Sequence, residues 1–120
     1  MMKMLTWNNR GLGHPSKLAA LKELIKSENP EIMLIQETKQ DQKDMSKVIS
    51  QQKHFCGSIS EARGASGGIA TLWDSNKWIC SSTNSQQSWI RTALESRTGG
   101  QSIIVYNVYA PNQYREKEIC

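Results

Sequence analysis

Apolar residues in the first third of the chain occur in short runs that predict a strand, a helix and a second strand. Residues 3–8 form the first predicted strand, and a loop containing Gly11 and Gly13 follows it, because glycine supplies the positive φ that tight turns need. From Pro15 onward, apolar residues recur at the three-to-four spacing of an amphipathic helix, namely Leu18, Leu21, Leu24 and Ile25. We expect this helix to end at Asn29, since the residue before a proline avoids helical geometry.

The run from Ile32 to Gln36 is apolar on both faces and predicts a buried strand parallel to the first. The helix between them supplies the crossover that parallel strands require. Residues 40–52 are polar with a thin apolar stripe, Met45, Val48 and Ile49, which predicts a short surface helix. A stretch rich in Gly and Ser then extends from Gly57 to Gly68.

The second half of the chain predicts a β-meander. Residues 69–73 form an apolar strand that ends at the turn cluster of residues 74–76, and residues 78–82 are its expected hairpin partner. Residues 88–95 partly alternate apolar and polar side chains, and two glycines connect them to a strand over residues 102–109. We expect these antiparallel strands to extend the first unit, because no repeat or linker divides the two. The predicted fold class is α/β (α+β).

Composition and charge fit one soluble domain. The chain has 120 residues, of which 38% are hydrophobic and 22% are charged, and this length leaves no room for two domains. The formal net charge is +4, and residues 1–29 carry +3 of it, from five basic and two acidic side chains. This excess is compatible with a polyanionic partner but is far from a dense Lys/Arg stripe. A solvated helix face is the plainer interpretation.

The cysteines and the N-terminal residues bear on the compartment. Cys56, Cys80 and Cys120 are odd in number and form no C-x-x-C pair, which argues against a disulfide framework or a zinc knuckle and favours a reducing compartment. The first residues lack the apolar core of a signal peptide, and no run approaches the roughly 18 apolar residues of a membrane span. We therefore expect an intracellular protein of the nucleus or cytoplasm that is not secreted and does not bind membranes.

Polar side chains follow the apolar runs where the predicted strands end. Asn8 ends the first strand, Glu37 follows the second, and Tyr109 and Asn112 follow the last. Such oxygen donors suit Mg²⁺ bound with water and phosphate better than zinc, and ligands of α/β folds commonly bind at this edge of the sheet. Each residue also has a plainer interpretation: Asn8 as a turn former, Glu37 as a strand-end charge, and Tyr109 as a half-buried aromatic residue.

Four motifs occur in order along the chain. They are Thr6-Trp7-Asn8 with Arg10-Gly11-Leu12, then Ile35-Gln36-Glu37-Thr38-Lys39, then Ser66-Gly67-Gly68-Ile69 with Leu72-Trp73-Asp74, and finally Asn107-Val108-Tyr109-Ala110-Pro111-Asn112. In this order they resemble the endonuclease/exonuclease/phosphatase superfamily. More narrowly, they resemble the apurinic-type endonuclease domain of plant LINE-type (non-LTR) retrotransposons. The resemblance covers nearly the whole chain and implies the N-terminal part of a four-layer α/β sandwich, with mixed β-sheets face to face and helices outside.

The resemblance implies a Mg²⁺-dependent phosphodiesterase, with Mn²⁺ as an alternative ion, that acts on nucleic acid and preferentially on DNA. It implies that Glu37 binds the metal and that Asn8 lies beside the metal and orients the catalytic carboxylate or the phosphate. Tyr109 would contact the scissile phosphate, and Asn112 would shape the site or contact the nucleic-acid backbone. The cation would offset charge on the phosphate while an activated water attacks in line.

The sequence departs from the family pattern in two places. Asn9 stands where the family usually has an apolar strand residue, and a polar amide there needs a partner or exposure. The family's Gly-Asp-x-Asn and Ser-Asp-His segments, which supply the acid/base Asp, a phosphate-binding Asn and a His paired to an Asp, have no match here. The chain's two histidines, His14 and His54, lie in the loop before the first helix and after the polar helix, so neither fits that role.

Loss of an acid/base group costs a factor of roughly 10²–10⁴ in rate. We therefore expect residues 1–120 to be a partial domain, truncated before its second half, that is inactive or nearly so by itself. Its second sheet would be unbuilt, and the strand over residues 102–109 would expose an apolar face or edge.

Two other functions remain open at this point. The chain is alternatively a non-catalytic retroelement remnant, or a nucleic-acid or protein interaction module, that keeps the strands without the chemistry. A nucleotide-binding α/β domain is disfavoured, because Gly11-x-Gly13 lacks both the third glycine and the Lys-Ser/Thr pair of a P-loop.

Overall fold

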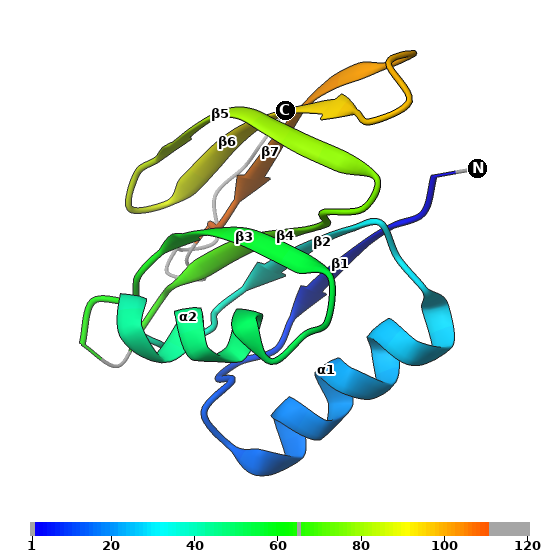
Figure 1. Ribbon diagram of the computed structural model, residues 1–120. Coiled ribbons are helices and arrows are strands. Elements are labelled where there is room, and N and C mark those ends of the chain that lie inside the picture. The colour runs from blue at the N-terminus through cyan, green and yellow to red at the C-terminus, as the bar shows by residue number, and fades with distance from the viewer. Residues whose placement is uncertain (1, 65, 111–120) are drawn as a thin grey trace, which may run out of the picture.

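The structure is a computed structural model that describes residues 2–64 and 66–110, and it has three layers (Figure 1). Two helices cover one face of a four-stranded mixed sheet, and a three-stranded antiparallel sheet packs on the other face. The predicted α/β fold class is thus confirmed. The elements, in chain order, are β1 (Met4–Asn8), α1 (Pro15–Glu28), β2 (Ile32–Gln36), α2 (Gln42–Ser50), β3 (Phe55–Ser60), β4 (Ile69–Asp74), β5 (Trp78–Ser85), β6 (Trp89–Ser96) and β7 (Ser102–Val108).

The predicted strand, helix, strand unit is present at the N-terminus. β1 and β2 pair in parallel, with Asn8 opposite Gln36. The His14 side chain caps α1 by accepting a hydrogen bond from the Ser16 backbone N–H at 3.1 Å, because the first N–H groups of a helix have no partner within the helix. α1 stops at the expected place, where Asn29 takes the left-handed conformation with φ of 48°. α2 buries its predicted apolar stripe, Met45, Val48 and Ile49.

One strand of the mixed sheet was not expected from the sequence. β3 pairs with β4, and the sheet order is β1-β2-β4-β3. Its residues fall partly within the Gly/Ser-rich stretch, and both Gly and Ser are weak indicators of a strand. Gly57 stands there because α2 crosses closely above it: a Cβ would lie 2.7 Å from Ile49 Cδ1 and 3.1 Å from the Thr71 carbonyl oxygen.

The predicted pairing of the strands on either side of the turn at residues 74–76 is wrong. β4 does not pair with β5, because β2 and β3 already occupy both of its edges. Its side chains are buried along almost its whole length, between the helices on one side and the second sheet on the other. After Asp74, which accepts hydrogen bonds from the backbone N–H groups of Asn76 and Lys77, the chain crosses into that second sheet.

The second sheet is a separate β-meander of order β5-β6-β7. The meander prediction is confirmed for its last three strands and is wrong for β4, which belongs to the mixed sheet. The expectations that these strands extend the first unit and that the second sheet is unbuilt are also wrong. One core cluster, which includes Met33 and Ile35, lies between the mixed sheet and the helices. A second cluster lies between the sheets and contains Ile32, Trp73, Trp78, Leu94 and Val105. Alternate residues of β2 thus face opposite cores, as its uniformly apolar sequence predicted.

The outer face of β7 is apolar and exposed, as expected for the last strand. Ile104, Tyr106 and Val108 are 56%, 57% and 61% exposed, and Trp89 of β6 lies beside Tyr106 with ring centroids 6.3 Å apart. In the described residues, neither helix covers this face.

Two further observations concern the cysteines and the helices. Cys56 and Cys80 are free thiols, and burial raises the pKa of the Cys80 thiol. Among the described residues, no helix is both long and apolar enough to cross a membrane.

Candidate functional site at the rim of the sandwich

Strand ends from both sheets meet at one edge of the molecule, which we call the rim. Within the mixed sheet, Gln36 is opposite both Asn8 and Ile69, and Ile69 is opposite Ser60. The ends of the second sheet lie at the same edge, because Asn107 of β7 bonds to Gln36. The rim consists of residues 8–11, 36–39, 61–64, 66–68, 86–88 and 109.

A buried amide joins the two sheets at this edge. Asn107 is fully buried, and its Oδ1 accepts a hydrogen bond from Gln36 Nε2 at 2.9 Å. Its Nδ2 donates to the Ala70 carbonyl oxygen at 3.0 Å and to Thr71 Oγ1 at 3.2 Å. Both ends of the amide are therefore satisfied, and a network of this kind fixes the relative position of the packed strands.

Backbone hydrogen bonds connect the rim loops to one another. Gly11 N–H donates to the Glu37 carbonyl oxygen at 2.8 Å, which ties the loop after β1 to the loop after β2. Thr38 N–H donates to the Gly68 carbonyl oxygen at 3.0 Å, and Lys39 N–H donates to that of Gly67 at 2.9 Å. The backbone around Glu37 is consequently held from both sides.

Three non-glycine residues of these loops have left-handed backbones. Arg10, Glu37 and Lys39 have φ values of 59°, 53° and 53°. This region is costly for residues with a Cβ, and the surrounding structure must impose it. Such residues cluster at functional sites, so the concentration of three around Glu37 marks the rim as a candidate site.

The structure brings together three of the four residues that the sequence singled out. Asn8 is exposed at the end of β1, and Glu37, half-buried, follows β2 at the same edge. Tyr109 follows β7, where its N–H donates to the Ser88 carbonyl oxygen at 2.8 Å. Its ring lies beside Gly67, since a Cβ at that glycine would be 4.0 Å from Tyr109 Cε2. Asn112 lies outside the described residues.

The chemistry of these side chains is that of oxygen ligands. Within residues 2–64 and 66–110, the Asn8 amide and the Glu37 carboxylate form no side-chain hydrogen bond or ion pair. The same residues contain no group of three or more His, Cys, Asp or Glu side chains that could hold a metal ion. One carboxylate and one amide fit an ion that retains several waters, as Mg²⁺ does, and do not fit a zinc site enclosed by protein ligands.

Asn9, the first departure from the family pattern, is fully buried. Its Oδ1 accepts a hydrogen bond from Gly11 N–H at 2.8 Å, and its carbonyl oxygen accepts one from Lys17 Nζ. Its Nδ2 has no partner in the described part of the chain. The expectation that a buried amide needs a partner is therefore met for Oδ1 and not for Nδ2. The hydrogen bond of Oδ1 shapes the turn at Gly11.

Neither histidine is among the rim residues. His14 caps α1. His54 lies at the opposite end of the mixed sheet, where its carbonyl oxygen accepts a hydrogen bond from Ser75 N–H at 2.7 Å, just before β3 begins at Phe55.

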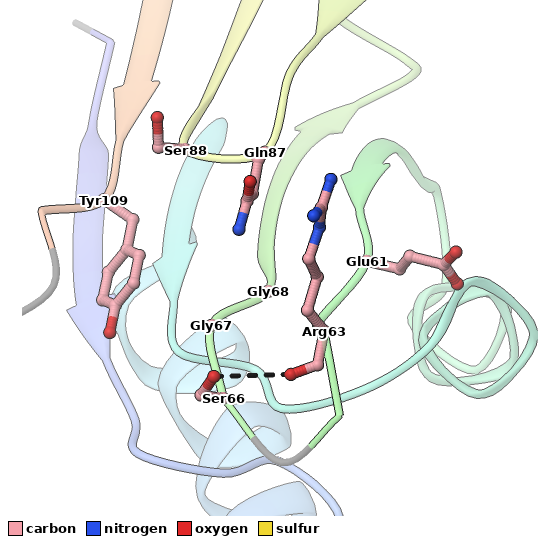
Figure 2. A pocket seen from close by; sticks show the side chains of 8 residues that line it. All are labelled: Glu61, Arg63, Ser66, Gly67, Gly68, Gln87, Ser88 and Tyr109. Carbon is pink, nitrogen blue, oxygen red and sulfur yellow. Dashed lines mark hydrogen bonds between the residues drawn. The ribbon is translucent and has the colours of Figure 1, made fainter.

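A cleft of about 400 Å³ opens on the rim beside Tyr109 (Figure 2). It lies between the β3–β4 loop and the β5–β6 loop and is lined by Glu61, Arg63, Ser66, Gly67, Gly68, Gln87, Ser88 and Tyr109. Sequence reasoning missed Arg63 and Gln87. No local signal identifies them, because they come from separate loops that meet only when the two sheets pack.

Comparison with known proteins identifies the same architecture elsewhere. A profile described as the Endonuclease/Exonuclease/phosphatase family matches residues 5–118. No curated protein matches the sequence.

Three solved structures illustrate the likeness of fold. The AP endonuclease LMAP of Leishmania major superposes with a TM-score of 0.75 at 19% identity over 95% of this chain and 41% of that one. The APE2 catalytic domain of Xenopus laevis gives 0.70 at 18% identity over 92% and 46%. The 3' phosphatase NExo of Neisseria, bound to a product DNA hairpin, gives 0.68 at 21% identity over 91% and 41%. The chain therefore spans less than half the length of each.

Proposed function

The chain belongs to the endonuclease/exonuclease/phosphatase family, and we propose that it forms the metal-binding and phosphate-binding half of a Mg²⁺-dependent phosphodiesterase acting on nucleic acid. The observation that carries this proposal is the convergence of Asn8, Glu37 and Tyr109 on one rim, from β1, β2 and β7. DNA is the favoured substrate, since the similar structures include AP endonucleases and an enzyme bound to a DNA hairpin.

In this proposal Glu37 is the carboxylate ligand of the ion, and Asn8 lies beside it as a further oxygen ligand and orients the phosphate. Mg²⁺ is the expected ion and Mn²⁺ an alternative, because both accept carboxylate, amide and water oxygen. When bound, the ion would neutralise charge on the phosphate and stabilise the leaving oxygen. The left-handed backbone of Glu37, held by Gly11 and the Thr38–Gly68 pair, would fix the direction of the carboxylate before the ion binds.

Tyr109 is proposed to contact the scissile phosphate through its phenol. Its backbone is anchored to Ser88, and its ring rests against Gly67, so the side chain is held at the mouth of the cleft (Figure 2). Asn112 is proposed to contact the nucleic-acid backbone or to complete the site.

Proton transfer is the step for which these residues provide no group. His14 caps α1, His54 lies at the far end of the mixed sheet, and Glu37 is the proposed metal ligand. We therefore propose that this chain by itself is inactive or nearly so. The same observation favours a second candidate, a non-catalytic remnant that binds nucleic acid without cleaving it.

The sequences of the four motifs support an origin in a plant LINE-type retrotransposon. The parent protein would then act on nucleic acid in the nucleus or cytoplasm. This origin is part of the proposal and not a requirement of the chemistry.

A nicking assay tests the proposal that this chain by itself is inactive. Supercoiled plasmid and an abasic duplex are incubated with the chain in Mg²⁺, and the Glu37→Ala variant serves as the control. We expect no cleavage above the level of that variant. Robust nicking that Glu37→Ala abolishes would show that the chain carries a complete site.

A further inference from the structure

We propose that the cleft beside Tyr109 binds a second backbone phosphate of a nucleic-acid strand through Arg63, so that the substrate is a polynucleotide and not a small phosphoester. The placement of this second phosphate next to the cleaved one rests on the proposed function. Binding in the cleft itself does not require the metal or the chemistry.

The cleft presents hydrogen-bond donors from two separate loops. Figure 2 shows the Arg63 guanidinium and the Gln87 amide extending into the space between the two loops. Ser66 and Ser88 also line the cleft, and the Ser66 hydroxyl donates to the Arg63 carbonyl oxygen at 3.4 Å. Guanidinium groups match phosphate oxygens with parallel hydrogen bonds, and an amide adds a neutral donor.

The acidic residue of the cleft does not neutralise Arg63. Glu61 Oε2 accepts a hydrogen bond from the Gln42 N–H at 2.9 Å, at the first residue of α2. A carboxylate is stabilised at a helix N-terminus, and Figure 2 shows this one directed away from the guanidinium. Arg63 forms no ion pair within the residues that the structure describes, so its charge is available to an anion.

The backbone that carries Arg63 is held in place before any ligand binds. Its N–H donates to the Ser66 carbonyl oxygen at 3.0 Å, and the Ser66 N–H returns a hydrogen bond at 3.2 Å. Gly64, with φ of 61°, allows this tight turn. The preceding residue, Ala62, is fixed to the Gln40 carbonyl oxygen at 2.9 Å. Less conformational entropy is therefore lost when a phosphate binds.

Tyr109 makes the cleft continuous with the proposed catalytic rim. It lines the cleft, and it is also the residue proposed to contact the scissile phosphate. A strand whose phosphate lies at Tyr109 can place a neighbouring phosphate at Arg63. A small phosphoester with one phosphate has no second anionic group, so it would leave Arg63 unused.

Binding of a labelled single-stranded DNA oligonucleotide, measured by fluorescence anisotropy in EDTA over a series of salt concentrations, tests the inference. Arg63→Gln removes the charge, and Arg63→Lys keeps it but loses the planar fork. Lys22→Gln on the exposed face of α1 is the matched control, because it changes the net charge equally. We expect roughly tenfold weaker binding for Arg63→Gln and a slope of log K against log salt smaller by about 0.7.

We expect Arg63→Lys to bind with intermediate affinity and Lys22→Gln to bind like the parent chain. Equal loss in Arg63→Gln and Lys22→Gln, or no loss in either, would overturn the inference. The Arg63 side chain is exposed, so the unfolding midpoint of Arg63→Gln should not change, and Gln87→Ala provides a second variant with a weaker expected effect. Because the assay contains no divalent ion, failure of the metal proposal would leave this result intact.

Discussion

The side-chain amides of Gln36 and Asn107 meet at 2.9 Å and join the two sheets directly behind the rim. Gln36 immediately precedes Glu37, and Asn107 lies two residues before Tyr109. The hydrogen bond therefore sets the distance between the strand that presents the proposed metal ligand and the strand that presents the proposed phosphate contact. A packing interaction and the geometry of the candidate site thus depend on the same pair of residues.

Removal of this junction is expected to destabilise the chain. Asn107→Leu removes the amide donor from the buried Ala70 carbonyl oxygen and Thr71 Oγ1, which costs about 1–3 kcal/mol in the free energy of unfolding, while Gln36 Nε2 keeps its hydrogen bond to Thr6 Oγ1. Urea denaturation followed by tryptophan fluorescence measures the loss. Asn84→Leu on exposed β5 is the matched control and should change stability by less than about 0.5 kcal/mol. Equal stability of the two variants would show that the junction has no structural role.

A methyl group at Gly68 is expected to disturb the loop that follows Glu37. The residue has φ of 88°, and a Cβ would clash with Thr38 Oγ1 and lie 3.2 Å from Lys39 N. Gly64→Ala is the control, because that residue also has a positive φ but would meet nothing within 4 Å. Both variants carry the backbone cost of about 1–2 kcal/mol, and only Gly68→Ala adds the clash.

Thermal unfolding should rank Gly68→Ala clearly below Gly64→Ala, and the amide resonances of Thr38 and Lys39 should shift only in the former. Equal melting temperatures with unshifted resonances would contradict the tight contact between these loops.

The exposed face of the second sheet is expected to cause self-association. Ile104, Tyr106 and Val108 present adjacent apolar side chains, and contiguous exposed apolar patches favour association. Sedimentation velocity at increasing protein concentration should show oligomers that the double change Ile104→Lys and Val108→Lys disperses. Ser85→Lys, on an exposed end of β5, adds charge elsewhere and should leave them intact. A parent chain that is monomeric at all concentrations would contradict this expectation.

Local patterning predicted much of the fold and the position of the candidate site along the chain. The apolar runs around Leu21 and Met33 identify α1 and β2, and the polar residues after them identify the strand ends that meet at the rim. The partners of strands were harder to predict. β3 was not predicted because it contains Gly57, a residue that disfavours a strand and lies where Ile49 leaves little room for a Cβ. The separation of β5 from β4 depends on the pairing of both edges of β4 with other strands.

Features that depend on tertiary contacts could not be predicted from the sequence. The left-handed backbone of Glu37 is imposed by hydrogen bonds from Gly11 and the Gly68 loop, and no propensity favours it in a glutamate. Arg63 and Gln87 likewise become neighbours only through the packing of the sheets. The order of the four motifs, by contrast, is a property of the sequence alone and is sufficient to indicate the family.

Metal binding at Glu37 tests the central claim most directly. Titration of the chain with Mn²⁺, followed by electron paramagnetic resonance of the free ion and repeated with Mg²⁺ as competitor, measures binding without any cleavage. We predict that the chain has one Mn²⁺ site, from which Mg²⁺ displaces Mn²⁺. Glu37→Gln should abolish this site, whereas Glu23→Gln on the exposed face of α1 should leave it unchanged. Equal Mn²⁺ binding by the parent chain and Glu37→Gln would contradict the assignment of the rim as a metal site.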